Sequence, residues 1–197
     1  HMDHVGGLPN LIWTLRKCTR RSADARDRLD GREIPLYVPH EDVYDGTRTL
    51  LCEGNPDFSA PFRITPRTVE DGIVYEAEDV CVRALHNCHL ESAPPFRSFS
   101  FRIELGDKSV VYSGDVKSIA DFAPLIDSCT LLLMETGHHA VEDVCQWLRD
   151  SGKTFGTLVF IHHGRAILQH PHREARKART LLDRPVVIAE DGMTLDV

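Results

Sequence analysis

Four side chains of this sequence have the types and the placement to do chemistry together. They are histidines and an aspartate that follow predicted strands or precede a glycine turn: His4, His89, Asp115 and His162. In open α/β folds the ends of neighbouring strands meet at one edge of the sheet, where such side chains can converge. Neutral imidazole and carboxylate suit zinc, iron or manganese, and a carboxylate can bridge two such ions. The pattern predicts a hydrolytic metal site.

Each of these residues also has an ordinary structural alternative. A single His or Asp at a strand end usually caps the backbone or forms a hydrogen bond in a polar core. Four such residues at the ends of successive elements favour a shared metal site over four separate structural roles. The neighbouring histidines His86, His139 and His163 are expected to line a pocket rather than to bind metal.

Histidine is unusually frequent in the chain, and cysteine is not arranged for metal binding. There are 11 histidines among 197 residues, and most stand in short clusters. The six cysteines include no CxxC pair and no close framework spacing, so we expect reduced thiols in the core. The search for chemistry therefore concentrates on histidine.

The composition limits the class of protein. The chain is 42% hydrophobic and 27% charged, which suits one soluble globular domain or at most two small ones. Its 23 Lys and Arg against 30 Asp and Glu give a formal charge of −7, which argues against a dominant nucleic-acid-binding surface. No apolar run approaches the roughly 20 residues that cross a bilayer, and no signal-peptide pattern opens the chain. We expect a cytoplasmic protein that does not contact membranes.

The elements that must position these residues follow from the apolar pattern. Helices are expected at residues 8–18, 41–52, 119–126, 141–149 and 173–182. Strands are expected at residues 34–39, 80–85, 98–104, 109–113, 129–134, 157–161 and 186–189. A charged linker is expected from Arg20 to Glu33, and the block before residue 80 alternates less clearly. Without a separating linker or repeat, residues 1–197 are expected to form a single domain of the α/β (α+β) class.

The ordered motifs resemble those of the metallo-β-lactamase fold hydrolases. Their signature H-x-H-x-D-H followed by glycines is similar in its second half to His1-Met2-Asp3-His4-Val5-Gly6-Gly7. The later motifs are matched by Ala84-Leu85-His86-Asn87-Cys88-His89, Ser113-Gly114-Asp115 and Leu158-Val159-Phe160-Ile161-His162. Each motif alone is weak, but the four occur in the family's order across nearly the whole chain.

The resemblance implies a four-layer αββα sandwich and a pair of divalent metal ions. The N-terminal strands and the family's first His ligand are expected to be missing from the chain as given, with His1-Met2 taken as motif residues. The implied ligands are His1, Asp3, His4, His89, Asp115 and His162. Asp115 would bridge the ions, and Asp3 could also orient the attacking water. Zinc is the expected metal, with manganese or iron as alternatives, and two such ions lower the pKa of a shared water toward ~7.

The last third of the chain resembles the phosphodiesterase branch that includes the tRNA 3′-processing nucleases. That branch has a His-Glu-Ala-Thr and a Gly-His-Ser-Thr element, which here correspond to Met134-Glu135-Thr136 and Gly137-His138-His139. Met134 departs from the family by replacing a His. By resemblance, Glu135 would support catalysis and His138 would be the general acid that protonates the leaving oxygen. The alternative is a loop Glu and a His at the start of a helix.

These observations predict a metal-dependent hydrolase that acts on a phosphodiester or a small phosphoester. One alternative keeps the site but cleaves a lactone, thioester or β-lactam carbonyl, and another is a non-catalytic metal-binding or regulatory relative. A small-molecule substrate is expected. Nucleic acid is not, because the net charge is negative and the interval from 115 to 162 has no room for a long tRNA-gripping arm. A homodimer is also expected, because missing N-terminal strands would leave sheet edges exposed.

Overall fold

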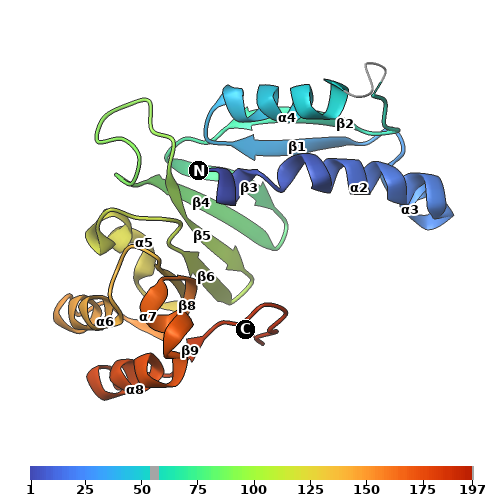
Figure 1. Cartoon of the computed structure of the whole chain (residues 1–197). Helices are drawn as coiled ribbons and strands as arrows, with labels where there is room; N and C mark the ends of the chain where they lie inside the picture. The colour runs from blue at the N-terminus through green and yellow to red at the C-terminus, as the bar shows by residue number, and fades with distance from the viewer. Residues whose placement is uncertain (54–57, 197) are drawn as a thin grey trace. The chain divides into compact units, whose positions relative to one another are not determined.

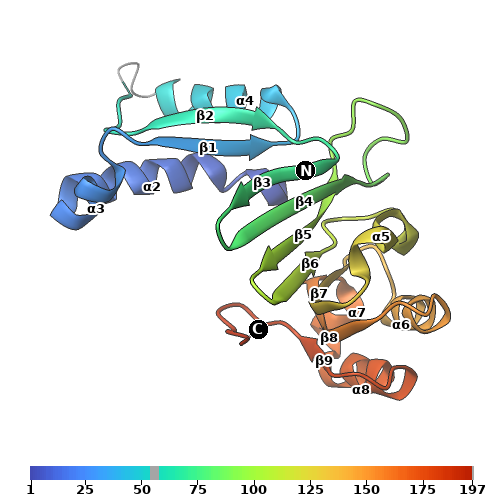
Figure 2. The ribbon, with the colours of Figure 1, turned by 180° about the vertical axis from the view of Figure 1, so that it is seen from behind.

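The computed structural model describes residues 1–53 and 58–196, which form two compact units, His1–Val69 and Glu70–Val197 (Figures 1 and 2). No helix in these described ranges has the length and apolar character needed to span a membrane. Both helices and strands are present, so the predicted mixed α/β class is confirmed. The expectation of a single domain stays a prediction.

The first unit is a two-stranded parallel sheet with helices. Its elements are α1 (Met2–Val5), α2 (Leu8–Arg21), α3 (Ala23–Leu29), β1 (Glu33–Val38), α4 (Glu41–Glu53) and β2 (Arg63–Thr68). The strands pair in register from Glu33–Arg63 to Val38–Thr68, and α4 packs along both. The predicted charged linker is wrong in part, because it contains α3. Ser22 caps that helix by accepting a hydrogen bond from the backbone N–H of Ala25 at 3.3 Å.

The second unit is built on a seven-stranded sheet of order β3-β4-β5-β6-β7-β8-β9. The strands are β3 (Gly72–Ala77), β4 (Val80–His86), β5 (Phe99–Leu105), β6 (Lys108–Tyr112), β7 (Cys129–Thr136), β8 (Phe155–His163) and β9 (Val186–Ile188). The pairs from β3 to β6 are antiparallel and those from β6 to β9 are parallel. Consequently β4, β6, β7 and β8 run in one direction, and their carboxyl ends share one edge of the sheet.

The helices of the second unit cover one face of β6 to β9 (Figures 1 and 2). They are the 3₁₀ helix η1 (Ile119–Phe122), α5 (Ala123–Ile126), α6 (Val141–Asp150), α7 (Arg165–Gln169) and α8 (Pro171–Leu181). Because β6 to β9 follow one another in sheet order, right-handed crossovers place all their connections on the same face. The core between them includes Val111, Phe122, Leu132, Met134, Leu148, Leu158 and Phe160. Burying each such large side chain stabilises the fold by roughly 1.5–3 kcal/mol.

Cysteine placement agrees only partly with the prediction of core thiols. Cys129 and Cys145 are buried in the core, and burial raises their thiol pKa values to about 11 and about 12. Cys18 is exposed, so the prediction is wrong for that residue. It lies on the solvent side of α2, where the helical pattern tolerates a small polar residue.

Candidate metal centre

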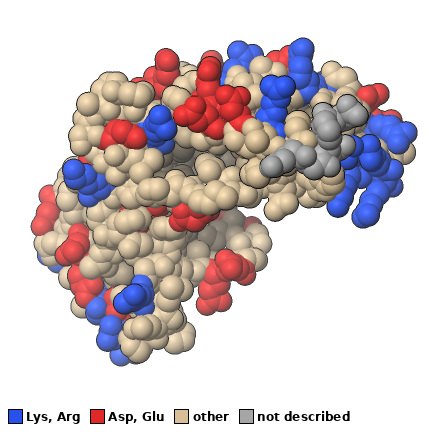
Figure 3. All heavy atoms as spheres, turned by 45° about the horizontal axis from the view of Figure 1, so that its top comes forward, with Lys and Arg blue, Asp and Glu red and all other residues tan. Residues whose placement is uncertain are grey.

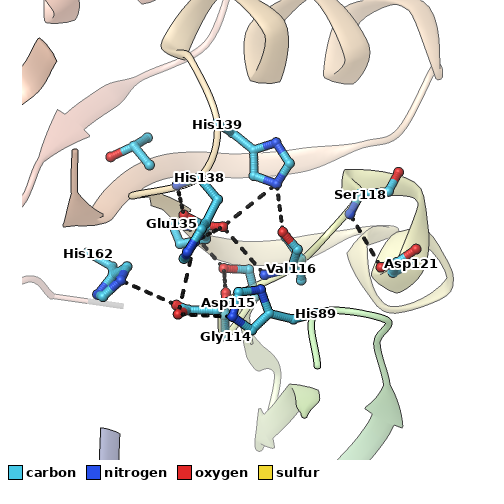
Figure 4. Close-up of polar contacts among 12 residues, drawn as sticks. His89, Gly114, Asp115, Val116, Ser118, Asp121, Glu135, His138, His139 and His162 are labelled. Atoms are coloured by element: carbon cyan, nitrogen blue, oxygen red, sulfur yellow. Dashed lines mark hydrogen bonds and ion pairs between the residues drawn. The ribbon is translucent and has the colours of Figure 1, made fainter. Parts of the chain in front are cut away.

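The carboxyl ends of β4, β6, β7 and β8 bring an aspartate and three histidines together (Figure 4). Asp115 is at the middle: its Oδ1 lies 3.5 Å from Nε2 of His162, and its Oδ2 lies 3.8 Å from Nε2 of His89 and 4.0 Å from Nδ1 of His138. Ligand atoms of Asp115, His138 and His162 all lie within 4.8 Å of one another. The sheet thus gathers residues that are far apart in sequence.

A tight turn after β6 holds Asp115 in place. Gly114 has φ +60°, and a Cβ there would stand 2.6 Å from the carbonyl oxygen of Phe99, so the turn requires glycine. Ser113 Oγ donates to the Gly114 carbonyl at 2.7 Å and accepts the backbone N–H of Glu135 at 3.0 Å. Asp115 is only 8% exposed. The backbone that carries the Asp115 carboxylate is therefore fixed in position.

The loop after β4 positions His89 through a buried asparagine. Asn87 Oδ1 accepts the backbone N–H of His89 at 3.1 Å, and Asn87 Nδ2 donates to Ser100 Oγ at 3.2 Å. The next contact along the loop comes from η1, where Asp121 Oδ2 accepts the backbone N–H of Cys88 at 3.1 Å. Two side-chain acceptors therefore hold the backbone N–H groups of Cys88 and His89.

A bulge in β8 directs His162 out of the regular strand pattern. Glu135 pairs with Ile161 and Thr136 with His163, so His162 is the extra residue between them. It has φ 45°, a strained value for a non-glycine residue that often marks a functional position. Its ring packs against Gly137, where an added Cβ would lie 2.7 Å from His162 Cδ2.

Glu135 and His138 form a pair beside Asp115. Glu135 is completely buried, its Oε2 accepts the backbone N–H of His138 at 2.9 Å, and its Oε1 lies 3.1 Å from His138 Nδ1. The backbone N–H of Val116 also donates to Oε1 at 3.4 Å. These donors compensate the burial of the carboxylate. Met134, the departure from the family pattern, is a fully buried core residue.

The other histidines have contacts of different kinds. His139 Nε2 lies 2.9 Å from the Val116 carbonyl oxygen and the residue lines the pocket of the centre, whereas His163 Nε2 lies 2.7 Å from the Ala189 carbonyl oxygen. His86 pairs with Asp71 at 2.6 Å. Of these three histidines, only His139 is among the residues that line that pocket.

The electrostatics of the centre favour the metal-binding form of His89. Burial lowers the pKa of His89, and the nearby His138 acts in the same direction against the carboxylates of Asp115 and Glu135. The ring is therefore neutral at physiological pH, and neutral imidazole is the form that binds a metal. Burial, followed by the charges of Asp115 and Glu135, raises the pKa of the Tyr112 hydroxyl.

The donor set fits a divalent transition metal. Tetrahedral sites have ligand bonds of about 2.1 Å, so two ligands of one ion lie about 3.4 Å apart. The separations of 3.5 and 3.8 Å between Asp115 and the rings of His162 and His89 are close to this value. Imidazole nitrogen with carboxylate oxygen suits zinc and also iron or manganese. His138 Nδ1 instead lies closest to Glu135.

The sequence-predicted residues divide between the two units. His89, Asp115, Glu135, His138 and His162 meet in the second unit. His1, Asp3 and His4 belong to the first unit: His1 directly precedes α1, which contains Asp3 and His4, and His4 Nε2 lies 3.7 Å from Asp3 Oδ2. The part these three play in the centre stays a prediction.

Sequence reasoning missed the residues that hold the backbone of the candidate ligands in place. Asn87 and Ser113 lie inside the matched motifs, but the motifs do not predict their roles, because each acts through the backbone of a neighbour. Asp121 had a usable signal: Ser118 and Asp121 have the spacing of a capping box, and the structure contains that box. Its bond to the Cys88 backbone is a long-range contact that this spacing does not predict.

Comparison with known proteins agrees with this geometry. No protein-family model matches the chain. Ribonuclease Z of Mycobacterium sp. strain KMS and that of strain JLS are each 24% identical over 226 residues, spanning 100% of this chain and 75% of theirs. Among solved structures, the metallo-β-lactamase fold protein YhfI from Bacillus subtilis matches with a TM-score of 0.66 and 18% identity, over 98% of this chain and 73% of its own. Human tRNase Z, short form, matches with a TM-score of 0.60 and 17% identity, over 100% and 75%.

These relatives correct one expectation and confirm others. The expectation of a small-molecule substrate, with nucleic acid unlikely, is wrong, because the relatives are named ribonuclease Z and tRNase Z. The net charge misled because it averages over the chain: Figure 3 shows Lys and Arg gathered over α3 and the end of α2 despite the negative total. The neighbours of this fold imply the use of divalent metal. The chain has the metallo-β-lactamase fold and is a metal-dependent hydrolase.

Proposed function

We propose that this hydrolase cleaves a phosphodiester bond of RNA. The observation that carries the proposal is the convergence of three histidines on Asp115, with the buried Glu135 holding one of them. The names of the curated relatives, ribonuclease Z, support RNA as the substrate class. The pocket at the centre has a volume of about 390 Å³, enough to admit a nucleotide.

The proposed ligands of the second unit are His89, Asp115 and His162. The sequence motif supports adding His1, Asp3 and His4, which would complete a centre for two divalent ions, with zinc as the proposed metal. Bound metal would supply a Lewis acid and a water activated for attack. The Asp115 carboxylate lies between the rings of His89 and His162 and would be a ligand shared by both ions.

Glu135 and His138 would supply the proton for the leaving group. A hydrogen bond from His138 Nδ1–H to Glu135 Oε1 fixes the ring and leaves Nε2 to carry the transferable proton. When the water oxygen bonds to phosphorus, the water gives up one proton to solvent, the bond from phosphorus to the leaving oxygen breaks, and that oxygen takes the proton from Nε2. His138 then regains a proton from solvent. Glu135 stabilises the charged ring before the transfer, because its carboxylate is buried and close.

The decisive experiment combines metal analysis with hydrolysis assays. Wild type is expected to hold about two equivalents of metal and to cleave an RNA oligonucleotide and bis(p-nitrophenyl) phosphate. Asp115→Ala and His162→Ala are expected to lose both metal and activity. His172→Ala is the matched control, since His172 is an exposed residue of α8.

Two results would contradict the proposal. One is full metal content and activity in Asp115→Ala. The other is a wild-type enzyme that hydrolyses lactones or thioesters but neither phosphodiester, which would assign the same centre to carbonyl chemistry.

A further inference from the structure

Lys117 stands at the rim of the metal centre, two residues after Asp115. We propose that it binds a phosphate of the RNA next to the one being cleaved, an inference that rests on the proposed function. The pocket that it lines is also lined by His89, Val116, His138 and His139. The side chain thus borders the same pocket as His89 and His138.

The backbone around Lys117 is held on both sides (Figure 4). The carbonyl oxygen of Val116, which is fully buried, lies 2.9 Å from His139 Nε2. On the other side, the backbone N–H of Ser118 donates to Asp121 Oδ2 at 3.3 Å, and Ser118 caps η1. Lys117 therefore projects from a fixed segment while its own side chain is exposed. Because the backbone is already fixed, a ligand has to order only the side chain.

The charge of Lys117 is not neutralised within the pocket. The lining residues include no carboxylate, and none of the residues that the structure describes forms an ion pair with this ammonium group. The nearby carboxylates have other partners: Asp121 accepts backbone N–H groups, and Asp115 is buried among the histidines. An anion entering the pocket would therefore meet an available cation.

The chemistry of a lysine fits a flanking phosphate. The ammonium group is a compact charge on a flexible stem, which suits phosphate contact without base recognition. Such a contact binds and positions the strand but takes no part in bond breaking. Its loss should therefore weaken RNA binding and reduce the salt dependence of that binding.

The test measures binding by the metal-loaded protein of a fluorescent single-stranded RNA with phosphorothioate linkages, which keep the charge and slow hydrolysis. Lys117→Met is expected to raise the Kd roughly three- to tenfold and to reduce the slope of log Kd against log salt by about 0.7. Lys117→Arg should restore most of the affinity. Lys108→Met is the control, because Lys108 begins β6 at the opposite edge of the sheet and should bind as wild type does.

Hydrolysis of bis(p-nitrophenyl) phosphate separates this inference from the proposed function. That compound has a single phosphate, so Lys117→Met should affect it less than it affects the oligonucleotide. An unchanged Kd and salt slope in Lys117→Met would overturn the assignment of Lys117, whatever the activity. An equal loss on both substrates would also overturn it, because Lys117 would then act at the reacting phosphate.

Discussion

The buried carboxylate of Glu135 contacts His138 twice, through Oε2 to the backbone N–H at 2.9 Å and through Oε1 to Nδ1 at 3.1 Å. One residue thus fixes both the main chain and the ring of the other. This double contact distinguishes His138 from His89 and His162, whose ring nitrogens lie nearer to Asp115 than to Glu135 in the described contacts. It assigns His138 to proton transfer more readily than to metal binding.

Replacing Glu135 by Gln should therefore lower kcat without removing metal. The amide keeps the shape of the side chain but loses the negative charge that favours a protonated ring. We expect kcat to fall about 10- to 100-fold, and His138→Ala to lower it by about 100-fold or more. Metal content by plasma mass spectrometry is the second measurement. Loss of metal in His138→Ala would make that residue a ligand instead.

Gly137→Ala should disturb the centre through His162. The new Cβ would lie 2.7 Å from His162 Cδ2, so the ring must shift. We expect a loss of about 1–3 kcal/mol in the free energy of unfolding and weaker metal binding. Gly46→Ala is the control, because nothing lies within 4 Å of its Cβ position in α4 and alanine favours helix. Chemical denaturation would measure the stability of both variants, and metal titration would measure their metal affinity. Normal metal affinity in Gly137→Ala would contradict the steric argument.

Much of the sheet was predictable because its strands are buried. Residues 129–134 and 157–161 are mostly apolar, and the structure places them in β7 and β8. The strands β2 and β3 were missed for the opposite reason. In β2, Arg63 and Pro66 interrupt the alternation of apolar and polar residues that is typical of a strand, and proline weakens a strand prediction. Helix α7 was missed because it is only five residues long.

The candidate centre shows the same division between local and long-range information. Asp115 and His162 were predictable because each follows a predicted strand, and the structure brings both to one edge of the sheet. The bulge that redirects His162 depends on how Glu135 and Thr136 pair with β8, which no short sequence pattern contains. Register and loop contacts are therefore what the sequence could not provide.

The ion pairs between α6 and α8 should make stability depend on acid pH. Lys177 bonds to Glu142 and also lies 3.1 Å from the buried Glu174. The hydrogen bond from Lys177 lowers the pKa of Glu142 below 4.5, so the pair stabilises the fold above that pH and loses its effect as pH falls through the lowered value. Lys177→Met should lower the free energy of unfolding at pH 7, because it removes the contacts of the ammonium group with both carboxylates.

The measurement for this pair is urea denaturation at neutral and at acid pH. The difference between Lys177→Met and wild type should narrow below pH 4.5, where Glu142 becomes protonated in the unfolded chain. Arg176→Met on the same helix is the matched control, since Arg176 is exposed. A difference that stays constant with pH would show that Lys177 acts through packing of its stem.

Asp121 should influence metal binding although it is not a ligand. Its Oδ2 accepts the backbone N–H groups of both Cys88 and Ser118, at 3.1 and 3.3 Å, and so ties the loop of His89 to η1. Asp121→Ala frees that loop, and we expect metal affinity to fall about tenfold, with Asp121→Asn retaining most of it. Ser118→Ala removes the cap of η1 but leaves the bond to Cys88. Equal loss of metal affinity in Ser118→Ala and Asp121→Ala would mean that η1, rather than the position of His89, controls the centre.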